Sequence, residues 1–208
     1  MTARAVGGRR EQRKARLKQT VKDAAWRLVR EQGYAAVTVE QIAAASGIAV
    51  ATFYRHFAGK DDVITRGWLT EDLIDDISGA ITGKETLAAT VRRLYAHYAR
   101  AVRTYEVDLL TRLRIIECEP SLRACMMKGR EHDTELLTNL FARLYGDDRA
   151  PHELRVAAGL VVAARSETLW CWVRSDGTVP LGQLLDRGAR IIAPSLEACE
   201  AAAAACHR

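Results

Sequence analysis

Residues 38–57, TVEQIAAASGIAVATFYRHF, contain two short helical patterns separated by a turn that includes glycine. Thr38 is typical of a helix N-cap, and Gln41 three positions later completes a capping box. Residues 46–48, SGI, predict a tight turn, after which a second short helix starts at about Val50. Two helices joined by such a turn form a helix-turn-helix. Its second helix can enter the major groove of DNA, which is about 12 Å wide.

Helical phase divides the second of these helices into a buried side and an accessible side. Phe53 and Phe57 are four residues apart, so they share one face and are expected in the core. The side chains that point elsewhere can donate hydrogen bonds to phosphate oxygens or base edges; they are Thr52, Tyr54, Arg55 and His56. Each also has an ordinary explanation as packing or solvated surface, so it is their combination that indicates DNA binding.

Charge is unevenly distributed along the chain and favours the same interpretation. Residues 1–60 contain 12 Lys and Arg against 4 Asp and Glu, a net charge of +8. Residues 61–208 contain the remaining 19 and 22, a net charge of −3. Because residues 1–60 are basic and the rest of the chain is slightly acidic, we expect residues 1–60 to bind a polyanion. Thr38 and Lys60 stand at predicted helix starts, where backbone N–H groups also favour an anion.

Other features argue against other classes of protein. The basic N-terminus lacks the apolar run of a secretory signal, and charged residues interrupt the longest apolar stretches, which predicts a cytoplasmic protein without membrane contact. Five scattered cysteines without a Cys-x-x-Cys pair predict reduced thiols. The motifs of common catalytic sites are missing, so we expect no catalytic residues and no cofactor. Poor spacing argues against a metal site at Glu117, Cys118, Glu119, His132 and Asp133.

The periodicity predicts an all-α protein with two kinds of helix. Residues 1–13 are expected to be a flexible basic arm, because two adjacent glycines disfavour a helix there. Residues 14–60 are expected to form a three-helix DNA-binding domain, and residues 61–208 a bundle of longer helices. The helices predicted after residue 80 are 85–103, 107–118, a long helix ending at 145, 151–174 and 180–192, with Pro194 separating the last of these from an alanine-rich terminal helix.

Residues 24–64, AAWRLVREQGYAAVTVEQIAAASGIAVATFYRHFAGKDDVI, resemble the DNA-binding domain of the TetR family of bacterial transcription regulators. The resemblance implies an all-helical homodimer whose C-terminal domain binds a small effector and dimerises. The shared pattern is Gly33-Tyr34, Thr38-Val39, Ile42-Ala43, Gly47-Ile48, Thr52-Phe53-Tyr54, His56-Phe57 and Lys60. The resemblance also implies phosphate contacts and base contacts, the former by Thr38, Thr52, Tyr54, His56 and Lys60, the latter by Val50, Ala51 and Arg55.

Two residues depart from the family pattern. Ala49 stands where the family usually has serine, which removes an N-cap worth typically about 1 kcal/mol. Ala51 stands where the family often has glycine, and its methyl group keeps the backbone slightly further from DNA but can touch a thymine methyl. These departures affect base preference rather than DNA binding as such.

The part of the chain after residue 80 is more weakly similar to C-terminal domains of actinobacterial TetR-family members, some of which respond to acyl-CoA-like ligands. This resemblance implies an apolar or acyl-CoA-like effector. Arg165 interrupts an apolar helix and needs a partner, either an acidic side chain or an anionic effector. Aromatic and methionine side chains can line a cavity, although each can also be ordinary core. The candidate pocket residues are Trp68, Tyr95, Tyr98, Met126, Met127, Arg165 and Trp172.

The last two long helices, at about 151–174 and 180–192, are the family's usual dimer-forming pair. Small residues on the first of them permit close helix approach, and larger apolar ones supply contacts. A dimer presents two recognition helices to a palindromic operator in double-stranded DNA. The candidate interface residues are Ala157, Leu160, Val161, Ala164, Leu169 and Trp170.

These features together predict a one-component transcription regulator, a repressor that a small-molecule effector releases from its operator. One alternative is a regulator or architectural DNA-binding protein without effector control, which predicts a filled C-terminal body and weak sequence preference. The other is an enzyme that uses the C-terminal pocket as its active site, with the DNA-binding domain as an accessory. No catalytic motif supports the enzyme.

Overall fold

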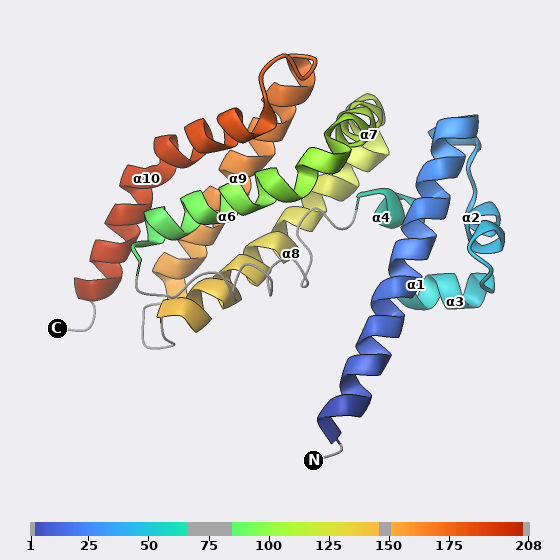
Figure 1. Cartoon of the computed structure of the whole chain (residues 1–208), viewed down its shortest axis with the longest axis horizontal. Coiled ribbons are helices and arrows are strands. Elements are labelled where there is room, and N and C mark those ends of the chain that lie inside the picture. Colours follow the sequence, from blue (N-terminus) through green and yellow to red (C-terminus); the bar gives the residue numbers. More distant parts are fainter. Residues whose placement is uncertain (1–2, 66–84, 146–150, 206–208) are drawn as a thin grey trace. The chain divides into compact units, whose positions relative to one another are not determined.

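Within residues 3–65, 85–145 and 151–205, which the computed structural model describes, every regular element is a helix (Figure 1). The all-α fold class predicted from the sequence is thereby confirmed. The chain divides into two units. The N-terminal unit comprises Met1–Arg66 together with Glu119–Met126, and the C-terminal unit comprises Gly67–Cys118 together with Met127–Arg208.

The N-terminal unit contains the predicted helix-turn-helix. The Thr38 hydroxyl accepts a hydrogen bond from the Gln41 N–H at 3.3 Å, and the Gln41 amide oxygen accepts one from the Thr38 N–H at 2.8 Å. Gly47 has a φ of 68°, which lets the Ile48 N–H reach the Ala43 carbonyl at 3.0 Å and end the helix. The elements of this unit are α1 (Ala3–Gln32), the 3-10 helix η1 (Tyr34–Ala36), α2 (Val39–Ala45), α3 (Val50–His56) and α4 (Lys60–Thr65).

The core of the N-terminal unit fixes the orientation of α3. Phe53 and Phe57 are 0 % and 2 % exposed, as predicted from their spacing, and their ring centroids are 5.5 Å apart. Because these two side chains anchor one face of a seven-residue helix, the opposite face stays accessible. The other helices of the unit and the connector before α2 supply the rest of the core, with Val21, Ala25, Trp26, Val29, Val37, Ile42, Ala43, Val63 and Ile64.

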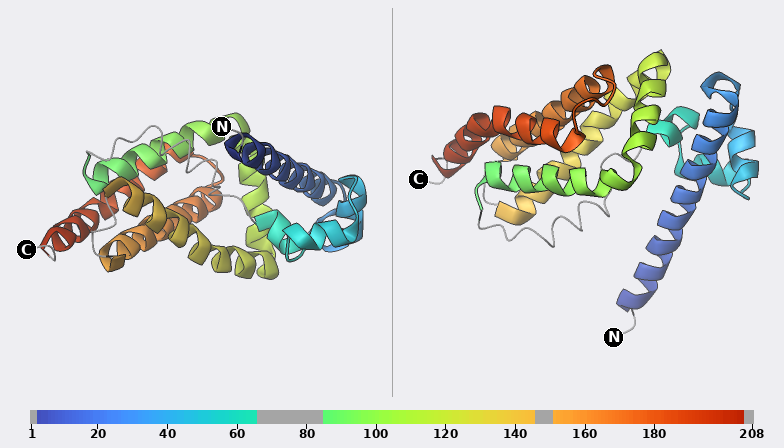
Figure 2. Two further views of the ribbon diagram at one scale, coloured as in Figure 1. Left: turned by 90° about the horizontal axis from the view of Figure 1, so that it is seen from below. Right: turned by 45° about the horizontal axis from the view of Figure 1, so that its top comes forward.

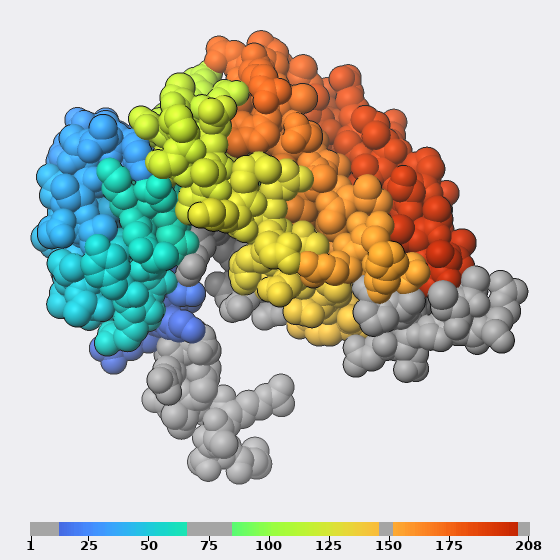
Figure 3. Space-filling model, turned by 180° about the vertical axis from the view of Figure 1, so that it is seen from behind, coloured from blue at the N-terminus to red at the C-terminus, as the bar shows by residue number. Residues whose placement is uncertain are grey.

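The C-terminal unit is a bundle in which α10 packs against both α6 and α9 (Figure 2). The space-filling view shows α9 in orange and α10 in red following one another across one face of this unit (Figure 3). Thr86 caps α6 by accepting a hydrogen bond from the Ala89 N–H at 3.2 Å. The elements are α6 (Leu87–Val102), the 3-10 helix η2 (Arg103–Tyr105), α7 (Glu106–Cys118), α8 (Pro120–Tyr145), whose first turns belong to the N-terminal unit, α9 (Pro151–Arg174) and α10 (Leu181–Ala205).

Two of the predicted helix boundaries are wrong. Helix α1 begins at Ala3, so most of the expected flexible arm is helical. Gly7 and Gly8 each cost about 1 kcal/mol relative to alanine, but the Arg, Gln, Lys and Ala residues that follow are strong helix formers. Helix α10 continues through Pro194. That residue is exposed, and buried side chains on both sides of it, Ala189 and Leu196, keep the two halves packed.

The domain boundary also differs from the prediction at residue 60. Helix α4 belongs to the N-terminal unit, as do the first turns of α8.

By length and composition, the segment His152–Arg174 is the one helix among the described residues that could cross a membrane, and half of its most apolar window is buried inside the protein. Core helices of globular proteins share this composition, and α9 contributes many buried residues to the C-terminal unit.

Candidate nucleic-acid interface and effector cavity

Helix α3 carries a row of accessible side chains on the side away from Phe53 and the C-cap residue Phe57. Tyr54 is 55 % exposed, although it is a large aromatic residue. Its hydroxyl and the exposed Arg55 guanidinium are therefore within reach of a phosphate or a base edge. Six of the eight residues that the sequence predicts to contact DNA lie on α3, and all six are exposed or half-buried: Val50, Ala51, Thr52, Tyr54, Arg55 and His56.

Cations surround the end of α3. Partial burial lowers the pKa of His56, and the nearby charges of Arg55, Lys18 and Lys14 lower it further. Two of these cations lie on α1, so α1 and α3 form one electropositive surface. Arg55 Nη2 also lies 3.5 Å from Thr52 Oγ1, which directs the guanidinium along the helix. A phosphate at this surface would interact favourably with all of these cations.

Lys60 and Thr38 are already engaged within the N-terminal unit. The Lys60 ammonium donates hydrogen bonds to the carbonyl oxygens of Tyr34 at 3.2 Å and Val37 at 3.0 Å, and lies 4.3 Å from the centre of the Tyr34 ring. It therefore holds the connector between α1 and α2 in place. The Thr38 hydroxyl accepts the capping bond from Gln41. Phosphate contact by either residue remains a prediction, and for Lys60 it would have to compete with these two carbonyl oxygens.

The sequence did not predict a hydrogen-bond network around Tyr34. Its hydroxyl donates to Asp61 Oδ1 on α4 at 2.5 Å and lies 3.0 Å from Ser121 Oγ at the start of α8. Burial and the bonded Asp61 carboxylate raise the pKa of Tyr34 to about 12, so the phenol stays protonated. The Thr65 hydroxyl is likewise 3.2 Å from Cys125 Sγ on α8. These contacts attach the first turns of α8 to the DNA-binding helices.

Ala49 occupies the N-cap of α3 and makes no side-chain capping bond. We expect Ala49→Ser to stabilise the protein by about 1 kcal/mol, because serine can accept a hydrogen bond from an otherwise unpaired N–H of the first turn. Urea denaturation followed by circular dichroism measures the change. Ala44→Ser, at an exposed position inside α2, is the control and should give no stabilisation. Equal midpoints for Ala49→Ser and the parent would contradict the expected capping.

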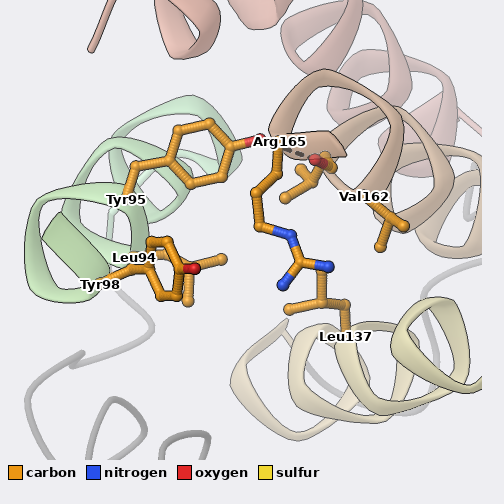
Figure 4. A pocket seen from close by; sticks show the side chains of 7 residues that line it. Leu94, Tyr95, Tyr98, Leu137, Val162 and Arg165 are labelled. Carbon is orange, nitrogen blue, oxygen red and sulfur yellow. Dashed lines mark hydrogen bonds between the residues drawn. The ribbon is translucent and has the colours of Figure 1, made fainter. Parts of the chain in front are cut away.

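The C-terminal unit encloses a small cavity of about 10 Å³, which is room for one water molecule. Helices α6, α8 and α9 each contribute to its lining, and aliphatic side chains form most of the wall (Figure 4). Three of the predicted pocket residues meet here: Tyr95, Tyr98 and Arg165. The complete lining is Leu94, Tyr95, Tyr98, Leu137, Val161, Val162 and Arg165.

Arg165 has the acidic partner that its burial requires. Its Nη2 lies 2.5 Å from Asp133 Oδ2 on α8, and the arginine is 6 % exposed. The Tyr95 hydroxyl donates to the Val161 carbonyl at 2.6 Å. The Arg165 Nε and Nη1 atoms and the Tyr98 hydroxyl are buried without a hydrogen-bond partner among the described residues. The surface of the cavity is thus apolar, and the unpaired donors are buried within the residues that line it.

The other predicted pocket residues lie elsewhere. Met127 is 55 % exposed, Met126 belongs to the N-terminal unit, and Trp172 is buried away from the cavity lining beside Gly177. Trp68 lies outside the described residues. Asp133 is the important residue that the sequence prediction did not identify as the partner of Arg165. Its signal was an acidic residue four positions before the buried Leu137, on the apolar face of a long helix.

The predicted dimer residues fall on two different faces of α9. Ala157, Val161 and Leu169 are at most 1 % exposed within the single chain, so they form its core and are not available to a second subunit. Leu160, Ala164 and Trp170 are half-buried and remain accessible. The small and large apolar residues of α9 are mixed on both faces, which is why composition did not separate them.

Acidic, histidine and cysteine side chains do not gather in groups of three that could hold a metal ion within the described parts of the chain. Of the candidates considered from the sequence, Asp133 pairs with Arg165, and Glu117 accepts a hydrogen bond from Arg174 Nε at 3.4 Å. Their carboxylates are therefore used in ion pairs.

Comparison with known proteins identifies the class of protein that this fold and surface define. Residues 22–66 match the model for bacterial regulatory proteins of the tetR family, and residues 85–197 match the model for the MftR C-terminal domain. The chain belongs to the TetR family of bacterial transcription regulators. It is therefore a DNA-binding regulator and not an enzyme.

Individual relatives agree with this assignment. The fatty acid metabolism regulator protein of Bacillus subtilis (strain 168) is 24 % identical over 162 residues, which are 74 % of this chain and 82 % of the relative. The crystal structure of Bacillus subtilis FadR in complex with stearoyl-CoA has a TM-score of 0.53 at 19 % identity, covering 84 % of this chain and 97 % of that one. Thermus thermophilus FadR in complex with lauroyl-CoA has a TM-score of 0.53 at 16 % identity, covering 84 % and 92 %.

Proposed function

We propose that this chain is a one-component repressor that binds a palindromic operator through α3 and releases it when an acyl-CoA-type effector binds the C-terminal unit. The observation that carries the DNA-binding part is the accessible row of donors on α3, beside the cations of α1. Support for the effector class comes from the relatives, which include a fatty acid metabolism regulator and proteins crystallised with acyl-CoA. The regulator would act in the cytoplasm, where it meets DNA.

The proposed operator contacts are of two kinds: phosphate contacts that position α3 on the duplex and base contacts that recognise the sequence. Tyr54 and His56 would donate to phosphates and fix the helix on the duplex, together with Thr52 and Thr38. Arg55 would read a base edge, since a guanidinium can pair with guanine. Val50 and Ala51, at the start of α3, would offer apolar contact to a thymine methyl.

Homodimerisation would use the outer faces of α9 and α10. Leu160, Ala164 and Trp170 are accessible on α9, and so is Val156, which is 42 % exposed. Ile191 on α10 is 78 % exposed and could also be covered by a second subunit. A two-fold dimer through these faces would present two copies of α3 to successive half-sites.

Helix α8 offers a physical route for control. Ser121 and Cys125 on its first turns contact Tyr34 and Thr65 of the DNA-binding helices, while Asp133, two to three turns later, pairs with Arg165 at the cavity. An effector that enlarges the cavity would have to displace α6, α8 or α9. Movement of α8 would then change the contacts of Ser121 and Cys125 with Tyr34 and Thr65 and bias the dimer between two conformations.

A gel-shift titration tests this function. The operator is first obtained by selection from random DNA, and lauroyl-CoA is then added to the complex. We expect lauroyl-CoA to release the DNA at micromolar concentration, while free CoA has no effect. Unchanged operator affinity would refute effector control by acyl-CoA and would favour the architectural alternative if sequence preference were also weak.

The lowered pKa of His56 makes operator binding depend on pH. In the free protein, partial burial and the neighbouring cations lower the pKa of His56 below its usual value, which favours the neutral imidazole. A bound phosphate stabilises the imidazolium and raises that pKa, so DNA binding takes up a proton. We therefore expect operator affinity to rise as pH falls from about 8 to 6 and to level off below the pKa of the free protein.

Fluorescence anisotropy across this pH range, at constant ionic strength, measures the effect. His56→Gln keeps a hydrogen-bond donor but does not titrate, so its affinity should vary less with pH. His132→Gln, an exposed histidine on α8, is the control and should keep the parent's pH dependence. An identical pH profile for His56→Gln and the parent would exclude protonation of His56 in the complex.

A further inference from the structure

Three buried hydrogen-bond donors belong to two of the residues that line the cavity of the C-terminal unit. They are Arg165 Nε, Arg165 Nη1 and the Tyr98 hydroxyl, and none of them has a partner among the residues that the structure describes. Arg165 is 6 % exposed and Tyr98 is 5 % exposed. Figure 4 shows the guanidinium of Arg165 and the side chain of Tyr98 lying on opposite sides of the same space. Buried donors are normally paired, so this arrangement favours the binding of an acceptor.

Both groups act as donors at neutral pH. Burial raises the pKa of Tyr98 to about 12, which keeps its phenol protonated. Burial alone would lower the pKa of Arg165, but the Asp133 carboxylate and the neighbouring tyrosines outweigh it, and the pKa is raised. Tyr95 is not available to a ligand in the same way, because its hydroxyl already donates to the Val161 carbonyl.

Charge balance decides which acceptor fits. The positive charge of Arg165 is already compensated by Asp133, at 2.5 Å. A carboxylate or phosphate placed beside them would leave a net negative charge in an apolar environment, which is strongly unfavourable. A neutral acceptor can take the free N–H and O–H bonds without adding charge. The four aliphatic residues of the lining, Leu94, Leu137, Val161 and Val162, suit a hydrocarbon attached to that acceptor.

We infer that the cavity binds the neutral carbonyl oxygen of an acyl thioester, with Arg165 and Tyr98 donating hydrogen bonds to it. This inference rests on the proposed acyl-CoA control and goes beyond it by naming the group that is recognised. The volume of about 10 Å³ accommodates one oxygen-sized group. The acyl chain occupies space that opens when the ligand enters between α6, α8 and α9.

A pair of ligands that differ only in the carbonyl oxygen, which two hydrogens replace, tests the inference. Lauroyl-CoA carries the thioester carbonyl, and S-dodecyl-CoA has a methylene group in its place. Isothermal titration calorimetry of the full-length protein should show a preference of at least about tenfold for lauroyl-CoA, as expected for a carbonyl that accepts from a charged donor. In Tyr98→Phe this preference should shrink several-fold. Tyr105→Phe, at an exposed tyrosine outside the lining, should keep it.

Laurate tests the charge argument separately. The parent protein should bind laurate weakly, whereas Asp133→Asn, which leaves Arg165 uncompensated, should bind it at least about tenfold better. Equal laurate affinity for the two proteins overturns the selection of a neutral group. Equal affinity of the parent for lauroyl-CoA and S-dodecyl-CoA overturns the carbonyl site and leaves the proposed effector control intact. Failure of both CoA derivatives to bind overturns the inference and the proposed acyl-CoA control together.

Discussion

Asp133→Ala should destabilise the protein by about 3–5 kcal/mol, because it leaves the buried guanidinium of Arg165 without a counter-ion. Arg165 is 6 % exposed, and Asp133 lies 2.5 Å from it. Two of the guanidinium nitrogens already lack partners within the described residues, so the substitution removes the bond of the third. Urea denaturation followed by tryptophan fluorescence reports on this region, since Trp170 and Trp172 lie on the same helix as Arg165.

Glu131→Ala is the matched control on the same helix. Glu131 pairs with Arg155, but its side chain is 70 % exposed, and exposed ion pairs contribute about 0–1 kcal/mol. The two variants therefore remove one carboxylate each from positions two residues apart. An Asp133→Ala protein as stable as the Glu131→Ala protein would contradict the buried pairing of Arg165.

Tyr54→Ala combined with His56→Ala should weaken DNA binding about 100-fold or more, whatever the DNA sequence. Each side chain is expected to donate to a phosphate, and a hydrogen bond to a charged group contributes about 1.5–3 kcal/mol. Phosphate contacts carry no sequence information, so affinities for operator and random DNA should fall together. Fluorescence anisotropy with both kinds of DNA, at several salt concentrations, measures the change, and the loss of the histidine should also reduce the salt dependence.

Folding is not expected to change in this double variant. Tyr54 is 55 % exposed, and the anchors of α3 are Phe53 and Phe57. Tyr105→Ala removes another exposed tyrosine, on η2 of the C-terminal unit, and should leave DNA affinity unchanged. Retained affinity in the double variant, with normal circular dichroism, would refute the phosphate assignment.

The DNA-binding helices could be predicted from the sequence because short-range chemistry determines them. The capping box at Thr38, the left-handed Gly47 and the four-residue spacing of Phe53 and Phe57 all act within one or two helical turns. Each of these features can therefore be recognised from residues that are close together in the sequence. The accessible side of α3 then follows from the buried side by helical phase.

The C-terminal unit was harder to predict because contacts between distant residues determine it. Arg165 and Asp133 are 32 positions apart, and only packing of α9 on α8 brings them together. Pro194 ordinarily ends a helix, but buried residues on either side hold α10 together. Helix α9 has apolar residues around most of its circumference, so the sequence could not tell the inner residue Val161 from the outer residue Leu160.

Selection of bound DNA from a random pool, performed with the parent and with Arg55→Ala, tests the central claim most directly. The account predicts that the parent enriches a palindromic site, because a dimer presents two copies of α3. Arg55→Ala should enrich the same site with relaxed preference at one base pair in each half, since one base-reading side chain has been removed. A parent that enriches no site, or an Arg55→Ala protein that enriches an identical one, would contradict the assignment of α3 as the reading helix.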